Sequence, residues 1–148
     1  MTIALLSTAV TAAKTAMVPP ALVLAICSAE TDWKPRINPD DGGSASHGLC
    51  QVKLTTAQMF DKKATPSKLR NNAYNARMAA LYLKYLMKRY PTESVCVISA
   101  YNAGKCLKNS KGRIMNRRHV NKVMGRMQMY ERIVQERYIV NGTRHGSN

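Results

Sequence analysis

The chain has 148 residues, enough for one domain with a substantial hydrophobic core, and we expect residues 1–148 to form a single domain. Its 45% hydrophobic residues are ordinary for a globular protein, which argues against a disordered chain. With 23 lysines and arginines against 8 aspartates and glutamates, the net charge is +15. Such a surface favours an anionic partner, either a nucleic acid or an anionic cell-wall polymer.

Apolar and small residues recur at helical spacing between Met1 and Met17, which predicts a first core helix. The apolar run is interrupted by Lys14 and by Pro19 and Pro20, so it is too short to cross a bilayer. No basic segment precedes it, and we find no recognisable export signal. A protein with this sequence that worked outside the cytoplasm would need another route of delivery or release.

A second helix is predicted up to Glu30, and residues 21–29 are apolar on nearly all sides, so this helix should be buried. Glu30 is its first acid and lies on the helical face of Val23, Ile26 and Cys27. Loss of water and the negative end of the helix dipole both favour the protonated carboxyl, which predicts a raised pKa. A carboxyl of this kind suits a general acid, whereas exposure or pairing with a lysine or arginine is the alternative.

The loop from Trp33 to Gly48 is long and rich in glycine and turn residues, which indicates a functional loop. A short helical run is expected to begin around residues 49–51. Further helices are predicted over residues 54–61, 71–90, 93–103 and 119–141, with a basic loop at 105–118 and a frayed tail at 143–148. Since no segment shows convincing strand alternation, we expect an all-α fold, or an α fold with a small hairpin in the Trp33–Gly48 loop.

The four cysteines show neither a C-x-x-C pair nor a spacing with histidine that suits a metal. We therefore predict no metal site and no redox motif. Cys27 and Cys96 fall on apolar helix faces, which favours free buried thiols. A bridge between Cys96 and Cys106 is the alternative.

Three motifs occur in order along the chain: Ala25-Ile26-Cys27-Ser28-Ala29-Glu30-Thr31, Gly48-Leu49-Cys50-Gln51 and Ala100-Tyr101-Asn102-Ala103-Gly104. Together they resemble the catalytic domain of lytic transglycosylases of the SLT type, which share the fold of goose-type lysozymes. The resemblance covers about residues 3–130, and Asn75 occupies the position of a family asparagine ahead of a long helix. The chain departs from the family pattern at three positions: Thr31 stands for serine, Cys50 for methionine and His119 for tyrosine.

The resemblance implies cleavage of the β-1,4 bond between N-acetylmuramic acid and N-acetylglucosamine in peptidoglycan, without a cofactor. By the same resemblance, Glu30 first protonates the glycosidic oxygen. It then acts as base on the muramoyl 6-hydroxyl, which closes on C1 and leaves a 1,6-anhydro end. An internal hydroxyl replaces water in this reaction, so no second carboxylate is needed, whereas ordinary glycosidases use two.

The resemblance also implies a set of substrate-binding residues around Glu30. They are Gln51 and the Gly48 backbone at the acetamido groups, Thr31, Ser44 and Ser46 near the intermediate, Tyr101 orienting Glu30, Asn102 on a sugar, and His119 beside the acid. The expected partners are the glycan strands of peptidoglycan and, through the basic surface, an anionic cell envelope. We expect a monomer.

Three other functions are compatible with the sequence. Asp40 or Asp41, in the loop after Glu30, would act as general base in a lysozyme-type hydrolase (muramidase), although both also suit turns beside Gly42. A nucleic-acid-binding module would explain the charge, but no recognition helix or stacking motif supports specific nucleic-acid binding. An inactive wall-binding relative is disfavoured by the intact Glu30.

Small size and high basic charge resemble a phage lysis enzyme (endolysin) or a wall-piercing domain of a virion. A transglycosylase of a bacterial secretion apparatus is the next interpretation. In each case, the site of action is the peptidoglycan of the periplasm or cell wall.

Overall fold

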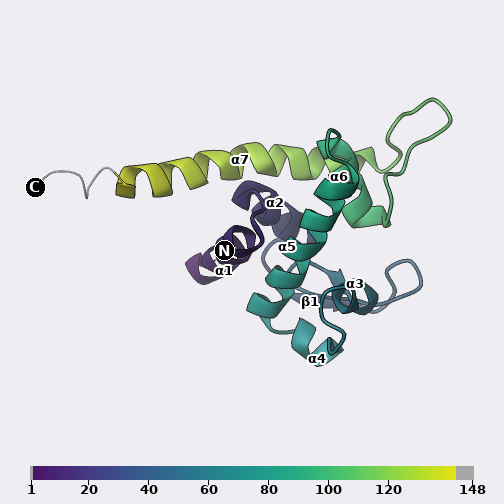
Figure 1. The fold of residues 1–148 in the computed structure, drawn as a ribbon, viewed down its shortest axis with the longest axis horizontal. Coiled ribbons are helices and arrows are strands. Elements are labelled where there is room, and N and C mark those ends of the chain that lie inside the picture. The colour runs from purple at the N-terminus through teal and green to yellow at the C-terminus, as the bar shows by residue number, and fades with distance from the viewer. Residues whose placement is uncertain (1, 143–148) are drawn as a thin grey trace, which may run out of the picture.

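The computed structural model describes residues 2–142, with side chains as far as residue 137. Its elements in chain order are α1 (Ile3–Ala16), α2 (Pro20–Thr31), β1 (Arg36–Asn38), β2 (Ser46–Gly48), β3 (Val52–Lys53), α3 (Leu54–Gln58), α4 (Pro66–Leu69), α5 (Asn72–Arg89), α6 (Ser94–Ala103) and α7 (Arg117–Gly142). Helices surround α2, the small sheet lies at one side of them, and α7 crosses the opposite side (Figure 1). The predicted fold class, α with at most a small sheet, is confirmed.

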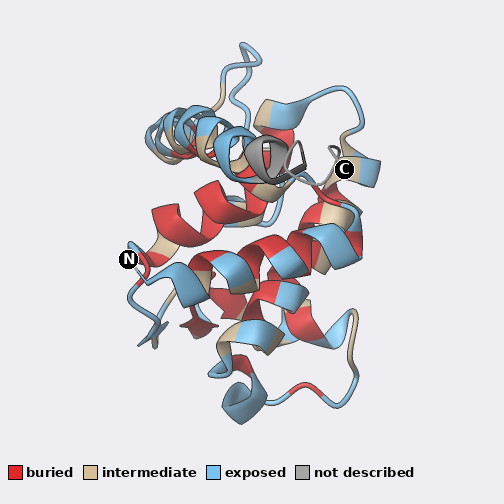
Figure 2. Cartoon of the chain, turned by 90° about the vertical axis from the view of Figure 1, so that its left-hand side faces the viewer, coloured by how far each residue is buried: buried red, intermediate tan, exposed pale blue. Residues whose placement is uncertain are grey.

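Helix α2 is the centre of the core, as its apolar sequence predicts. It packs against α1, α5 and α7, and ten of its twelve residues are buried. Figure 2 shows this buried strip between the more exposed outer helices. Pro20 begins the helix, where a missing N–H is no loss, and Asp32 ends it in the left-handed conformation at φ 50°. The buried packing fixes the last turn of α2, which carries Glu30.

The sheet is antiparallel in the order β1-β2-β3. Ile37 pairs with His47, and His47 also pairs with Val52. The hairpin between β1 and β2 lies inside the Trp33–Gly48 loop, where a small hairpin was the alternative expectation. The predicted helical run at residues 49–51 is wrong, because these residues form a tight turn between β2 and β3. Gln51 adopts φ 51° in that turn, which interrupts any helix.

All four cysteines are in disulfides, so the prediction of free thiols at Cys27 and Cys96 is wrong. Cys27 of α2 bonds to Cys50 in the turn before β3, and Cys96 of α6 bonds to Cys106 in the loop after that helix. Cys27 and Cys96 are nevertheless buried on their apolar helix faces, as expected. Sequence pattern alone did not show that Cys50 packs against α2, whereas the Cys96–Cys106 alternative was foreseen.

The later helices follow the predicted order with small shifts at their ends. Helix α5 has an apolar face with helical spacing, in which Ala76, Ala79, Leu83 and Leu86 are buried. Helix α4 was missed because it is a single turn that begins at Pro66. The predicted frayed tail at 143–148 lies outside the described residues. Among residues 2–142, none of the helices combines the length and hydrophobicity that a membrane span requires.

Candidate active site

A cleft of about 340 Å³ opens beside the end of α2. Its walls come from β1, the β1–β2 loop, β3 and α3 on one side, and from α5 and the end of α6 on the other. Among the predicted site residues, Glu30, Gln51, Tyr101 and Asn102 line this cleft. The three sequence motifs therefore meet at one place, because α2, the β2–β3 turn and α6 converge there.

The Glu30 carboxyl is the most perturbed acid of the cleft. Its side chain is only 18% exposed. Its pKa is raised from 4.5 to about 7, chiefly by burial and also by the charge of Asp41, while Lys122 and Arg36 oppose the rise. The predicted raised pKa is confirmed, and its main cause is the expected loss of water. At neutral pH, Glu30 is thus populated in both the acid and the carboxylate form.

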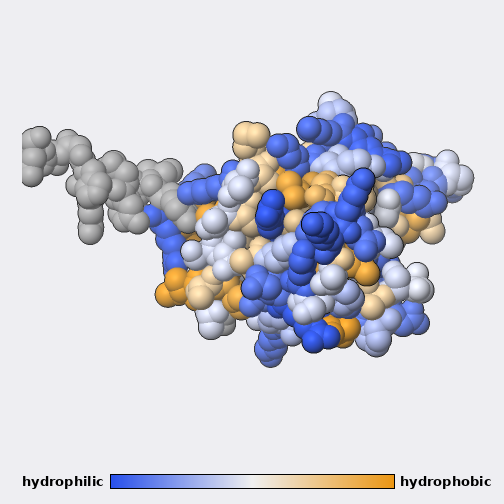
Figure 3. Space-filling model, turned by 60° about the horizontal axis from the view of Figure 1, so that its bottom comes forward, coloured by the Kyte–Doolittle hydropathy of each residue, from blue (hydrophilic) through white to orange (hydrophobic). Residues whose placement is uncertain are grey.

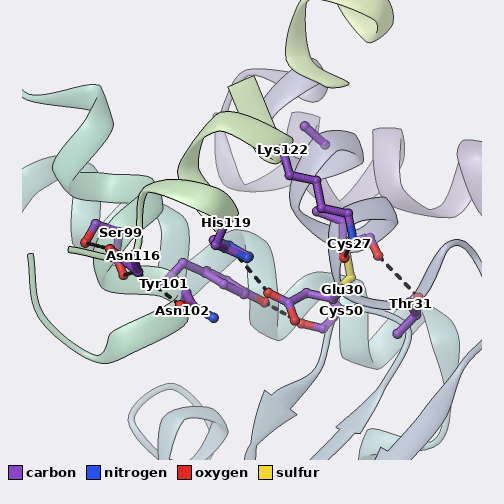
Figure 4. Close-up of polar contacts among 12 residues, drawn as sticks. Cys27, Glu30, Thr31, Cys50, Ser99, Tyr101, Asn102, Asn116, His119 and Lys122 are labelled. Atoms are coloured by element: carbon purple, nitrogen blue, oxygen red, sulfur yellow. Dashed lines mark hydrogen bonds and ion pairs between the residues drawn. A yellow bond between two sulfur atoms is a disulfide. The ribbon is translucent and has the colours of Figure 1, made fainter. Parts of the chain in front are cut away.

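His119 and Tyr101 approach Glu30 from α7 and α6 (Figure 4). His119 Nε2 lies 3.7 Å from Glu30 Oε1. Burial and the charge of Lys122 lower the pKa of His119, so the imidazole is neutral at pH 7 and this contact is not an ion pair. Burial, and then Glu30, raise the pKa of Tyr101 well above 10, so its phenol stays protonated. Both neighbours of Glu30 are therefore neutral groups.

The Tyr101 hydroxyl is directed at the backbone, where it donates to the Cys50 carbonyl over 2.8 Å. Because Cys50 is bonded to Cys27 of α2, this hydrogen bond joins α6 to the helix of Glu30 through the β2–β3 turn. Tyr101 therefore fixes one wall of the cleft.

Gln51 is held by three contacts of its side-chain amide. Its Oε1 accepts a hydrogen bond from the Ser46 hydroxyl at 3.0 Å, and its Nε2 donates to the carbonyls of Gly48 and Arg36, each at 2.9 Å. Ser46 is fully buried. Ser46 and Gly48, both predicted to bind substrate, thus lie behind the cleft surface and orient Gln51, which lines it.

Asn75 supports the same turn from α5. Its amide accepts from the Cys50 N–H at 2.8 Å and donates to the carbonyls of His47 and Leu69. Gly48 has φ 77°, and an added Cβ would meet the Asn75 side chain and the Leu69 carbonyl. The turn before β3 therefore requires glycine at this position.

Thr31 and Ser44 lie outside the cleft lining. The buried Thr31 hydroxyl donates to the Leu49 carbonyl at 2.7 Å and so ties α2 to the β2–β3 turn. Ser44 is exposed in the β1–β2 loop, where its carbonyl accepts from the Asp41 N–H. The Asp40 carboxylate caps Gly43 in the same loop, as a turn residue does, whereas Asp41 lines the cleft.

Arg36, Lys53 and Lys122 were not assigned to the site from the sequence, and for Tyr82 packing was favoured over a place in the groove. Arg36, Lys53 and Tyr82 line the cleft, and Lys122 reaches the end of α2. For Lys122 a signal existed, since it lies three residues after His119 and shares its helical face. Within the described residues, no group of histidine, cysteine and acidic side chains is gathered as a metal site would require.

The fold and the cleft place a buried, protonatable carboxyl, that of Glu30, in an open groove with a polar lining. Residues 7–124 match the model of the transglycosylase SLT domain family, and the chain belongs to this family. It is a peptidoglycan lytic transglycosylase with a goose-lysozyme-like fold. No curated protein matches the chain.

Proposed function

We propose that Glu30 is the general acid and then the general base of the transglycosylase reaction. The observation that carries this proposal is its pKa of about 7 inside the cleft. A carboxyl of this pKa can hold a proton at neutral pH and release it when the leaving group needs it. The two side chains that face Glu30 do not change their charge near pH 7, because His119 is neutral and Tyr101 keeps its proton.

The proposed reaction has two proton transfers through the same carboxyl. Glu30 protonates the glycosidic oxygen while the bond from C1 of N-acetylmuramic acid breaks. The resulting carboxylate removes the proton of the muramoyl 6-hydroxyl, whose oxygen bonds to C1. The products are a free N-acetylglucosamine 4-hydroxyl and a 1,6-anhydro end. Glu30 is protonated again, and no water is consumed.

Around Glu30, we assign supporting roles according to position. Asn102 lines the cleft and carries an amide suited to the acetamido and hydroxyl groups of the glycan. Gln51 lines the same cleft, and because its amide N–H groups are used within the protein, only its Oε1 has acceptor capacity left for the glycan. Tyr101 fixes the wall beside Glu30, and His119 offers a neutral imidazole to the same region. Ser46, Gly48 and Thr31 shape the turn from behind.

Hydrolysis by water is the second candidate outcome, since Asp41 lines the cleft and its charge acts on Glu30. In such a muramidase reaction, Asp41 would activate a water on the far side of C1. The two outcomes differ in their products, because hydrolysis adds one water to each cleaved bond.

We further propose that the basic surface holds the enzyme on an anionic cell envelope, as a monomer. The loop after α6 and the start of α7 support this, because Lys105, Lys111 and Arg113 in the loop and Arg117 and Arg118 in the helix are all exposed. Hydrophilic side chains also dominate the face shown in Figure 3. The net charge of +15 favours a role in phage lysis or wall penetration, with delivery to the periplasm or wall by a lysis system, a virion or a secretion apparatus.

Mass spectrometry of soluble products from purified peptidoglycan tests the catalytic proposal. We expect muropeptides that are one water lighter than the hydrated species, and none of them from Glu30→Gln. Full activity of Glu30→Gln would overturn the role of Glu30. Hydrated products would instead support the muramidase reaction. Asp41→Asn would then test Asp41 as its general base.

A further inference from the structure

The last turn of α2 receives a cationic side chain at each of three successive backbone carbonyls. Arg126 donates a hydrogen bond to the Ser28 carbonyl. Lys122 donates to the Ala29 carbonyl at 2.6 Å, and Arg36 donates to the backbone carbonyl of Glu30 at 3.0 Å. Carbonyls at the C-terminus of a helix carry partial negative charge and have few partners within the helix; the Ser28 carbonyl also accepts from the Asp32 N–H at 2.8 Å. Three cations from two other elements, α7 and β1, therefore hold the turn that carries Glu30.

We propose that Lys122 and Arg36 are positioning residues for the reaction, which fix the Glu30 turn and stabilise the carboxylate that remains once the proton has left. The inference rests on the proposed role of Glu30. It goes further, because it assigns a function to two cations that neither contact the scissile bond in the proposed reaction nor belong to the three sequence motifs.

The electrostatics of the cleft support this assignment. Burial and Asp41 both make Glu30 hold its proton, whereas Lys122 and Arg36 lower its pKa. His119 and Tyr101 also face Glu30, but the first is neutral and the second protonated at pH 7. The charged groups acting on Glu30 are thus one carboxylate and two cations.

This balance suits a group that must both give and take a proton. With burial and Asp41 alone, the carboxyl would be a weaker acid toward the glycosidic oxygen. Lys122 and Arg36 strengthen it as an acid by favouring its carboxylate. Because both also bond to carbonyls of the same turn, the charge is kept at a fixed place relative to Glu30.

Arg126 provides a matched control on α7. It lies one helical turn after Lys122 and donates to the neighbouring carbonyl of Ser28. Its other contact is an ion pair with Asp32 at 2.6 Å, and its charge is not among the causes that shift the pKa of Glu30. Removing Arg126 therefore loosens the same helix end without removing positive charge that acts on Glu30.

The pH dependence of muropeptide release tests the inference, with Lys122→Met, Lys122→Arg and Arg126→Met beside the unchanged enzyme. Activity should fall as Glu30 loses its proton at high pH. In Lys122→Met we expect this alkaline limb to move up by roughly one pH unit and the maximal rate to fall. Lys122→Arg should restore both, and Arg126→Met should lower the melting temperature but leave the limb in place.

A direct titration separates this inference from the catalytic proposal. The chain has four glutamates, Glu30, Glu93, Glu131 and Glu136, so carboxyl-labelled glutamate gives a simple NMR spectrum. The midpoint of Glu30 should rise in Lys122→Met and remain unchanged in Arg126→Met. An unmoved midpoint and limb in Lys122→Met would overturn the inference, even with Glu30→Gln inactive. An active Glu30→Gln would overturn the catalytic proposal instead.

Discussion

Replacing Glu30 by glutamine should stabilise the protein at alkaline pH while it removes activity. The pKa of Glu30 is about 7 in the folded chain, against 4.5 for an ordinary glutamate. Each pKa unit corresponds to about 1.4 kcal/mol, so the shift corresponds to about 3 kcal/mol. The folded state holds the extra proton, so this stability is present below pH 4.5 and is lost as pH rises through 7. Because glutamine carries no charge, the variant does not lose this folding stability as pH rises.

Urea unfolding of both proteins between pH 4 and pH 9, with disulfides intact, measures this difference. We expect the free energy of unfolding of Glu30→Gln to rise relative to that of the unchanged protein as pH rises from about 4.5 to 7. The difference between the two proteins should level off above pH 8. Glu131→Gln, at an exposed position of α7, is the matched control and should show no such trend. A difference for Glu30→Gln that does not depend on pH would refute burial of its charge as the cause.

Three further changes probe the frame around Glu30. Gly48→Ala places a Cβ 2.5 Å from the Leu69 carbonyl at a positive φ, and should lower the free energy of unfolding by about 2 kcal/mol in urea titration. Replacing Cys27 and Cys50 together by alanine removes a bridge across 23 residues and should cost about 3 kcal/mol. Tyr101→Phe loses the hydroxyl bond to the Cys50 carbonyl; we expect a loss of about 1 kcal/mol and slower release of muropeptides.

Each of these expectations has a result that contradicts it. An unchanged urea midpoint in Gly48→Ala would show that the β2–β3 turn can yield to a methyl group. If the cysteine variant unfolds like the unchanged protein, the bridge does not restrain the unfolded chain. For Tyr101→Phe, full activity would mean that the hydroxyl does not fix the cleft wall.

The parts of the site predicted from sequence depended on neighbours within one element. The raised pKa of Glu30 followed from Val23, Ile26 and Cys27 on its own helix, and these residues are indeed fully buried. The helical core followed from apolar periodicity. Local patterns predicted these two features because the spacing of apolar residues shows which face of a helix is buried.

What the sequence did not reveal depends on contacts between distant elements. Cys50 meets Cys27 only because α2 packs on the β2–β3 turn. Lys122 reaches a carbonyl 93 positions earlier in the chain, and its place on the helical face of His119 does not by itself reveal this partner. The strands have two or three residues each, too few to show alternation. The disulfide pairing, the strand pairing and the positions of the charges around the cleft could therefore be seen only in the tertiary fold.

The two disulfides make the structure of the enzyme dependent on the redox state of its compartment. Cytosolic reductants keep thiols reduced, whereas the periplasm and cell exterior are oxidising. In the cytosol, Cys27 and Cys50 would be separate thiols, and the turn with Gln51 would lose its covalent link to the helix of Glu30. We therefore expect the newly made chain to have a looser cleft. In an oxidising compartment the Cys27–Cys50 bond can form, and the cleft should then tighten.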